Sequence, residues 1–303
     1  MTIDNVHFNE GYLVPSTYDD MLPPHYYAGR EDIELVTDWL EARYGNRRIP
    51  RALDIGCGNG RVTEVFASRI DTLYGSDKSE GMIGAFASRF PDAQAIVCDT
   101  ERLPAAFRDR GEAPFDLITT FWSLSYPILE CFEELDADGV HVVSDEQEGL
   151  ARARVFLDGI ISMLAEDGVL LGQFFDADTQ EQRLVTELWE TIHPFPGTGR
   201  RYTWEILTEH LLAAERAGVG RFTTTRLPGA IVIESLGKAR QWFAVGHLNS
   251  YDPLISASTT TERIDSFLSQ FVRPDGSVLL PSGMHMFTFE KTDPSRALPA
   301  RLQ

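Results

Sequence analysis

The sequence has no long apolar runs, few cysteines and a shortage of basic residues, and each of these absences removes a class of protein. The longest apolar runs, such as residues 168–175, are far shorter than the roughly 20 residues that a membrane-spanning helix needs. The first four residues, Met1 to Asp4, also lack the basic start of a signal peptide. We therefore expect a soluble, cytoplasmic protein without a membrane partner.

The cysteine pattern and the net charge exclude further classes of protein. Cys57, Cys98 and Cys131 are scattered and show no CxxC spacing, so they indicate neither a disulfide framework nor a zinc knuckle. The 27 basic residues against 46 acidic ones give a net charge of −19. Such a charge repels phosphate backbones at long range, and we expect no nucleic-acid partner.

Strand-like and helix-like segments alternate through the middle of the chain. Strands are expected at residues 51–56, 72–77, 93–99, 115–122 and 168–175, with helices at 60–69, 79–89 and 148–165. Strands that alternate with helices form right-handed βαβ units and a parallel sheet. The pattern predicts an α/β fold with a doubly wound sheet.

The segments on either side of this core predict a cover. Residues 1–45 are expected to form an N-terminal cap and helix, and residues 46–303 the main domain, with insertions at about 178–202 and 236–275 that cover a substrate. The acidic stretch 130–147 is expected to be a surface loop or a short helix. Further expectations are a helix at 203–217 with Thr203 as N-cap, strands at 221–226 and 230–235 around a turn at 227–229, and a strand pair at 278–280 and 285–290 around Pro281-Ser282-Gly283.

The first expected strand runs into a glycine-rich turn, Asp54-Ile55-Gly56-Cys57-Gly58-Asn59-Gly60. Missing side chains let a ligand approach the backbone, and the following helix offers N–H donors. The spacing is GxGxG and not the nicotinamide pattern GxGxxG. Asp54 would repel a pyrophosphate but can hold an ammonium group, directly or through water. The turn alone is also compatible with simple packing.

Two further carboxylates end the next two strands. Asp77 follows the glycines by about 20 positions, where an acidic residue can hold a ribose diol at the carboxyl edge of the sheet. Its alternative role is a helix N-cap, although Ser79 can equally start that helix. Asp99 lies at the same edge and could accept a hydrogen bond from an adenine amino group.

Taken together, the segments resemble the class I S-adenosylmethionine-dependent methyltransferases, particularly the small-molecule branch. The resemblance covers residues 51–176 and rests on five segments in order: LDIGCGNGRVT, LYGSDKSEGMI, AIVCDTERLP, FDLITTFWSLSYP and LAEDGVLLGQFF. It implies a Rossmann-like, seven-stranded sheet whose last strand, 285–290, runs antiparallel, with the helical cap and insertions added to it. It also implies S-adenosyl-L-methionine as the cofactor.

The resemblance assigns cofactor-binding positions by match. Those at the methionine end are Asp54, Gly56, Gly58 and Gly60, and those at the ribose and adenine are Asp77, Lys78, Met82, Asp99, Thr100 and Phe121. The sequence departs from many relatives after the fourth strand, where residues 121–127 read FWSLSYP and no NPPY-like run occurs. Methylation of a base amine by that mechanism is therefore not supported.

Methyl transfer from a sulfonium is an in-line displacement, so a base is needed only if the acceptor must lose a proton. His25, His193 and Tyr126 are the candidate catalytic residues. Tyr18 and Tyr26, in a cap that resembles the lids of small-molecule relatives, and Trp122 are the candidate substrate-binding residues, with aromatic packing as the alternative role. We expect no metal site. His247, His285 and Asp176 could in principle serve as ligands, but they do not show the short sequence spacing that is typical of metal-binding residues.

The sequence therefore predicts methyl transfer to an oxygen or nitrogen atom, with carbon third, of a small metabolite in a capped cleft. Two alternatives stay open: a protein or carrier-tethered substrate, and a noncatalytic cofactor-binding or partner-binding module. The acceptor and the oligomeric state are not determined by the sequence.

Overall fold

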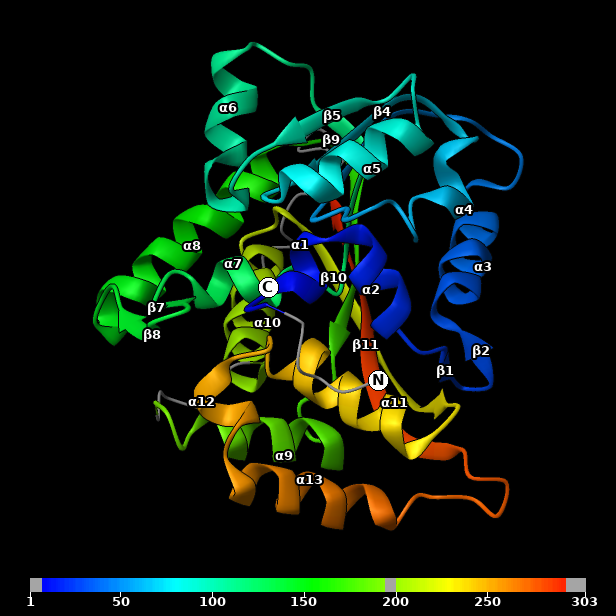
Figure 1. Ribbon diagram of the computed structural model, residues 1–303. Coiled ribbons are helices and arrows are strands. Elements are labelled where there is room, and N and C mark those ends of the chain that lie inside the picture. Colours follow the sequence, from blue (N-terminus) through cyan, green and yellow to red (C-terminus); the bar gives the residue numbers. More distant parts are fainter. Residues whose placement is uncertain (1–6, 194–199, 293–303) are drawn as a thin grey trace, which may run out of the picture.

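The computed structural model describes residues 7–193 and 200–292. Its centre is a mixed sheet with strand order β2-β1-β10-β11-β9-β6-β3-β4-β5, nine strands in the described part of the chain (Figure 1). The strands are β1 (His25–Tyr27), β2 (Arg30–Glu31), β3 (Ile49–Ile55), β4 (Ile70–Asp77), β5 (Gln94–Val97), β6 (Phe115–Phe121), β9 (Leu164–Phe175), β10 (Gly220–Ile233) and β11 (Val278–Lys291).

Five neighbouring strands, β9, β6, β3, β4 and β5, run parallel, which confirms the α/β prediction. Their connections contain η1 (Thr100–Arg102), α4 (Glu64–Ala67), α5 (Glu80–Arg89), α6 (Leu103–Asp109), α7 (Ser125–Leu129) and α8 (Glu146–Ser162). The expected helix at 60–69 is reduced to α4, because residues 60–63 form turns between the glycines and the helix.

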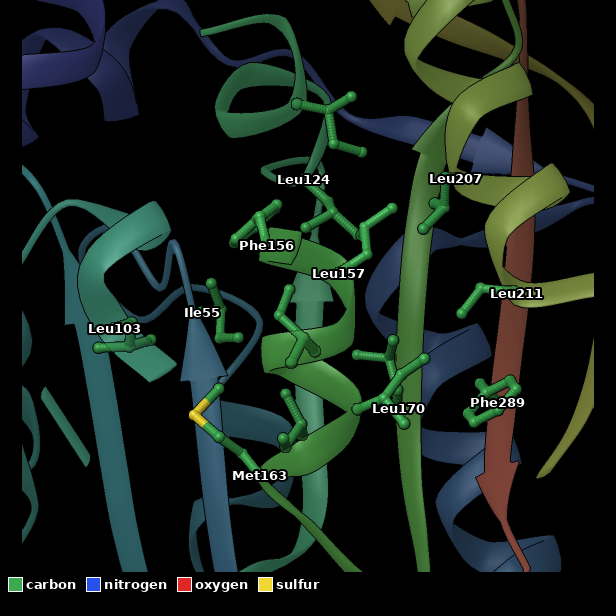
Figure 2. Close-up of a cluster of buried hydrophobic side chains, with 14 of the residues drawn as sticks. Ile55, Leu103, Leu124, Phe156, Leu157, Met163, Leu170, Leu207, Leu211 and Phe289 are labelled. Atoms are coloured by element: carbon green, nitrogen blue, oxygen red, sulfur yellow. The ribbon is translucent and has the colours of Figure 1, made fainter. Parts of the chain in front are cut away.

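Both faces of the sheet are covered, so its central strands are buried on both sides. On one face, Phe156 and Leu157 of α8, Leu207 of α10 (Arg200–Arg216) and Leu170 of β9 belong to one buried cluster, part of which Figure 2 shows. On the other face, Val36 of α3 (Asp32–Tyr44) and Phe86 of α5 belong to a second buried cluster. The parallel strands therefore lie between two buried clusters, one on each face of the sheet.

In the antiparallel half of the sheet, the turns predicted at 227–229 and 281–283 are wrong. β10 and β11 pair without interruption over 14 residues each, with Pro228 opposite Gly283 and Ala230 opposite Pro281. The carbonyl of Pro228 accepts from Ala28 N, so this residue faces β1 and its missing N–H costs the pairing with β11 nothing. Pro281 lies beyond the end of the pairing between β11 and β9. The prolines and glycines therefore lie within long strands.

The last strand, β11, runs antiparallel to both neighbours, as the resemblance implied. The sheet exceeds the implied seven strands because the N-terminal segment adds β1 and β2 beside β10. Gly229 makes this possible, since a Cβ there would lie 2.2 Å from the carbonyl oxygen of Tyr26. Before β1, the segment forms α1 (Glu10–Leu13) and α2 (Pro15–Met21), so part of the predicted cap belongs to the main sheet.

The acidic stretch 130–147 is neither loop nor short helix, and that prediction was wrong. It contains a hairpin of β7 (Glu133–Asp136) and β8 (Gly139–Val142). Its turn is stabilised by Asp136, whose Oδ1 accepts from the backbone N–H groups of Asp138 and Gly139. Gly139 has a φ of 145°, which favours glycine.

The remaining helices form a third layer at one end of the sheet. They are α9 (Gln180–Trp189), α11 (Leu236–Gln241), the π-helix η2 (Trp242–His247), α12 (Asp252–Ile255) and α13 (Ser258–Ser269). Thr203 lies inside α10 and is not its N-cap. Residues 194–199 of the expected insertion at about 178–202 lie outside the described residues. No described helix is long and apolar enough to cross a membrane.

Candidate active site

The glycine-rich loop joins the carboxyl end of β3 to the turns before α4. All three of its glycines have a positive φ, between 53° and 83°. A Cβ at Gly56 would lie 2.4 Å from the Cβ of Ser123, and one at Gly60 would lie 2.4 Å from the ring of Phe90. A Cβ at Gly58 would meet no atom within 4 Å. Gly56 and Gly60 therefore serve packing, and Gly58 is the one that leaves space for a ligand.

Asp77 connects this loop to the next helix. Its Oδ2 accepts from Gly58 N at 3.0 Å and its Oδ1 accepts from Ser79 N at 2.9 Å. Ser79 is the N-cap of α5, accepting from Met82 N. Asp77 is thus not the N-cap, and each of its oxygens keeps a lone pair for a further donor. Burial raises the pKa of this carboxyl above its usual range.

Asp54 lies beneath the loop and is almost inaccessible. One carboxylate oxygen accepts from the hydroxyl of Thr63 at 2.5 Å and the other from that of Thr119 at 2.9 Å. Burial raises its pKa to about 7, against the two hydroxyl groups, which lower it. The two threonines therefore fix the orientation of Asp54 at the floor of the site.

These residues share one cavity of about 350 Å³. It extends from the glycine loop to the underside of the N-terminal segment 8–25 and on to β7, α9 and η2. The candidate residues that line it are Tyr18, His25, Asp54, Gly56, Gly58, Asp77, Lys78, Met82, Thr100, Phe121, Trp122, Tyr126 and His193. The fold therefore brings most of the sequence-predicted site together.

Three candidates lie elsewhere. Gly60 packs against Phe90, as described above. The side chain of Asp99 is 59% exposed, 3.9 Å from Arg102, and does not line the cavity. Tyr26 is also absent from the cavity walls, because strand alternation on β1 turns Tyr27 inward. Their proposed ligand contacts stay predictions.

The residues present fit an adenosyl ligand that bears an amino acid. Gly58 leaves an open approach to the backbone, Asp77 offers acceptors for a ribose diol, and buried Met82 lines the same wall. Asp54 supplies a carboxylate on the floor of the same cavity.

A family model described as a methyltransferase domain matches residues 52–136. The chain is 24% identical over 265 residues to the malonyl-[acyl-carrier protein] O-methyltransferase of Enterobacter lignolyticus, which covers 88% of this chain and 91% of that protein. The chain is a class I S-adenosylmethionine-dependent methyltransferase. Its cofactor is S-adenosylmethionine, as the resemblance implied.

Other relatives of this methyltransferase share less. It is 32% identical over 101 residues to a trans-aconitate 2-methyltransferase of Variovorax paradoxus, covering 33% of this chain and only 37% of that protein. The solved structure of the YcgJ protein from Bacillus subtilis aligns with a TM-score of 0.50 at 15% identity, over 86% of this chain and 98% of that chain. That likeness shows a common fold alone.

A buried ionic network, which the sequence analysis missed, joins the loop of this methyltransferase to its N-terminal segment. Arg61, directly after the glycines, donates to both oxygens of Asp32 at 3.0 and 2.6 Å. Asp32 also accepts from the indole N–H of Trp122 at 3.0 Å. Desolvation raises the pKa of the partly buried Tyr18, and the positive charge of Arg61 opposes this rise. Trp122 and Tyr18 were candidates from the sequence, whereas Arg61 and Asp32 were not, and of these two only Arg61 had a signal, its place after GxGxG.

His25 lies close to two tryptophans in the same cavity. Its ring centroid is 6.2 Å from that of Trp122 and 5.4 Å from that of Trp242. Its Nδ1 lies 2.6 Å from the carbonyl oxygen of Pro23. Because a carbonyl only accepts, Nδ1 carries the hydrogen, and Nε2 of the neutral ring is an acceptor. Burial lowers the pKa of His25 and favours this neutral form.

Two other buried carboxylates lie near the cavity. Glu181 of α9 is fully buried, and its Oε1 lies 2.8 Å from His247 Nε2 and accepts from Trp242 Nε1 at 2.8 Å. The imidazole and the indole belong to the π-helix, and the ionic partner lowers the pKa of Glu181 against its burial. Glu133 of β7 lies 3.6 Å from His193. Neither carboxylate was predicted as a site residue.

Metal ligands do not gather in the described residues. No group of three or more His, Cys, Asp or Glu side chains there is placed to hold an ion. Of the three ligands considered in the sequence, His285 lies 3.9 Å from Asp176, but His247 pairs with Glu181 instead.

Proposed function

We propose that this methyltransferase transfers the methyl group to an oxygen or nitrogen atom of a small metabolite held beneath the N-terminal segment. The observation that carries the proposal is the single cavity shared by the glycine loop and this segment, with His25 in its wall. S-adenosylmethionine supplies the methyl group on its sulfonium sulfur. The protein's own task is to align the acceptor, exclude water and take a proton.

We infer that His25 is the base. Its Nδ1–H is held by Pro23 O, which leaves Nε2 as the proton acceptor. The neighbouring rings of Trp122 and Trp242 restrict the imidazole and offer flat apolar surfaces to an acceptor. Such a base is needed for a hydroxyl or an ammonium acceptor, because either must lose a proton on methylation.

A carrier-tethered substrate is the second candidate, since the relative that aligns over 88% of this chain is named for malonyl-[acyl-carrier protein]. The cover disfavours it. Tyr12 of α1 donates to Gly246 O of η2 at 2.5 Å, and Lys238 of α11 holds Asp20 of α2 at 3.0 Å. These contacts tie the N-terminal segment down across the cavity. A polymer would require them to open.

The experiment supplies S-adenosylmethionine with a labelled methyl group to the enzyme and a cell extract divided by ultrafiltration. We expect label in the small-molecule fraction, and its loss in His25→Ala. The matched control is His141→Ala, because His141 lies exposed on the β7–β8 hairpin. Label confined to the protein fraction would favour the carrier-tethered alternative and contradict the small-metabolite proposal.

A further inference from the structure

The part of the cavity formed by the hairpin and α9 differs from the rest in its chemistry. Its walls include Leu135 and Val140 from the hairpin, and Val185 and Trp189 from α9. Glu133, at the start of β7, is the carboxylate among them. His193 follows the last turn of α9, and its backbone N–H donates to the backbone carbonyl of Trp189. Gln182 and Thr186 of α9 also line this part, so its walls are mainly apolar, and Glu133 is the carboxylate in them.

Glu133 is unlike the other carboxylates of the cavity. Its side chain is only 10% exposed, and its Oε2 accepts no hydrogen bond from any residue in the described part of the chain. Among the described residues, the basic group within 4 Å of Glu133 is His193, 3.6 Å away and beyond hydrogen-bond distance. Burial raises the pKa of Glu133 to about 7. A buried acceptor without a donor is costly, and a ligand that brings a donor removes that cost.

The other carboxylates of the cavity walls already have donors. Asp32 has Arg61 and Trp122, Asp54 has Thr63 and Thr119, Asp77 has two backbone N–H groups, and Glu130 has Lys78. The lysine and the arginine of the described cavity walls, Lys78 and Arg61, are therefore already paired with Glu130 and Asp32. An acidic tail on the acceptor would therefore meet no unpaired lysine or arginine there, whereas a donor would meet Glu133.

We propose that Glu133 determines specificity for the methyl acceptor by binding a donor group, a protonated amine foremost and a hydroxyl second, at the end of an apolar body. This assignment rests on the proposed function, since it names the substrate class of the same cavity. It separates this enzyme from relatives named for malonyl and aconitate substrates.

The test uses three matched probes, 3-phenylpropylamine, 3-phenylpropanol and 3-phenylpropionate, and the full chain saturated with S-adenosylhomocysteine at a pH of about 8, above the raised pKa of Glu133. Calorimetry should rank the amine first and the carboxylate last, with about a tenfold gap, because a hydrogen bond to a charged group contributes enough for that ratio. Glu133→Gln should reduce the affinity for the amine about tenfold. Glu134→Gln, the exposed neighbour on the same strand, should leave the ranking unchanged.

The ranking by the unaltered enzyme is a test that does not depend on the folding of any variant. A carboxylate probe that binds as tightly as the amine overturns the assignment, as does an amine affinity that Glu133→Gln leaves intact. S-adenosylhomocysteine affinity and methylation by the same samples are measured in parallel. A failure of methyl transfer to small molecules, with the amine preference present, would count against the proposed function and not against the Glu133 subsite.

Discussion

The glycine-loop half of the cavity and the half beneath the cover are built in different ways. The first uses residues from successive strand ends between Asp54 and Phe121, and its central contacts are backbone N–H groups held by Asp77. The second joins residues far apart in the chain, such as Tyr12, whose hydroxyl donates to the backbone carbonyl of Gly246, 234 positions away. A local motif thus forms the glycine-loop half, which we propose binds the cofactor (the cofactor half), whereas long-range packing forms the half beneath the cover, which we propose binds the acceptor (the acceptor half).

Gly58→Val tests the cofactor half and should have the largest effect. A branched side chain would fill the open approach at a φ of 53°, so S-adenosylhomocysteine binding should become unmeasurable by calorimetry. Gly84→Val is the control, because Gly84 also has open space but lies exposed on α5, away from the cavity. Normal binding in a folded Gly58→Val protein would contradict the role of this glycine.

His25→Ala tests the acceptor half. The methyl-transfer rate should fall by about 10² or more, as for the loss of a general base, with cofactor affinity unchanged. In the unaltered enzyme the rate should be constant above neutrality and fall as the pH drops through the lowered pKa of His25, because protonation removes the acceptor at Nε2. A rate that keeps its value in His25→Ala would assign the proton transfer to another group.

Asp77→Ala should weaken S-adenosylhomocysteine binding by roughly ten- to a hundredfold. The substitution removes the carboxylate oxygens that would accept from the ligand, and it also removes the bridge between the backbone N–H groups of Gly58 and Ser79. The comparison variant is Asp99→Ala. Since Asp99 is 59% exposed and outside the cavity walls, its loss should matter far less. Equal losses in calorimetry would restore Asp99 to the adenine contact that its position in the sequence suggested.

Tyr12→Phe should have the smallest effect. It removes one neutral hydrogen bond between the cover and η2, which corresponds to a few-fold rise in the KM of the acceptor with unchanged cofactor affinity. Tyr26→Phe should change neither quantity, because Tyr26 does not line the cavity. A larger effect from Tyr26→Phe in steady-state kinetics would show that the cover rearranges when the acceptor binds.

Several features could be predicted because their signals are local. The period changes between residues 51 and 175 predicted the five parallel strands, and the spacing of Gly56, Gly58 and Asp77 predicted their convergence at one edge. The errors arose where local signals mislead. Pro228 and Pro281 indicate turns, but each lies in a long strand at a position where no ladder hydrogen bond is lost.

The sequence by itself determined the parallel core, the cofactor and most of the residues that line the cavity around the glycine loop, since a strand end, a glycine and a carboxylate in one βα unit act within a few residues of one another. Only the tertiary structure decided which of the three glycines leaves space for a ligand, since that depends on Ser123 and Phe90. It also decided that Asp32 pairs with Arg61 and that Glu133 is buried in the cavity without a hydrogen-bond donor in the described residues. Burial and pairing across long sequence separations come from packing, which no local pattern encodes.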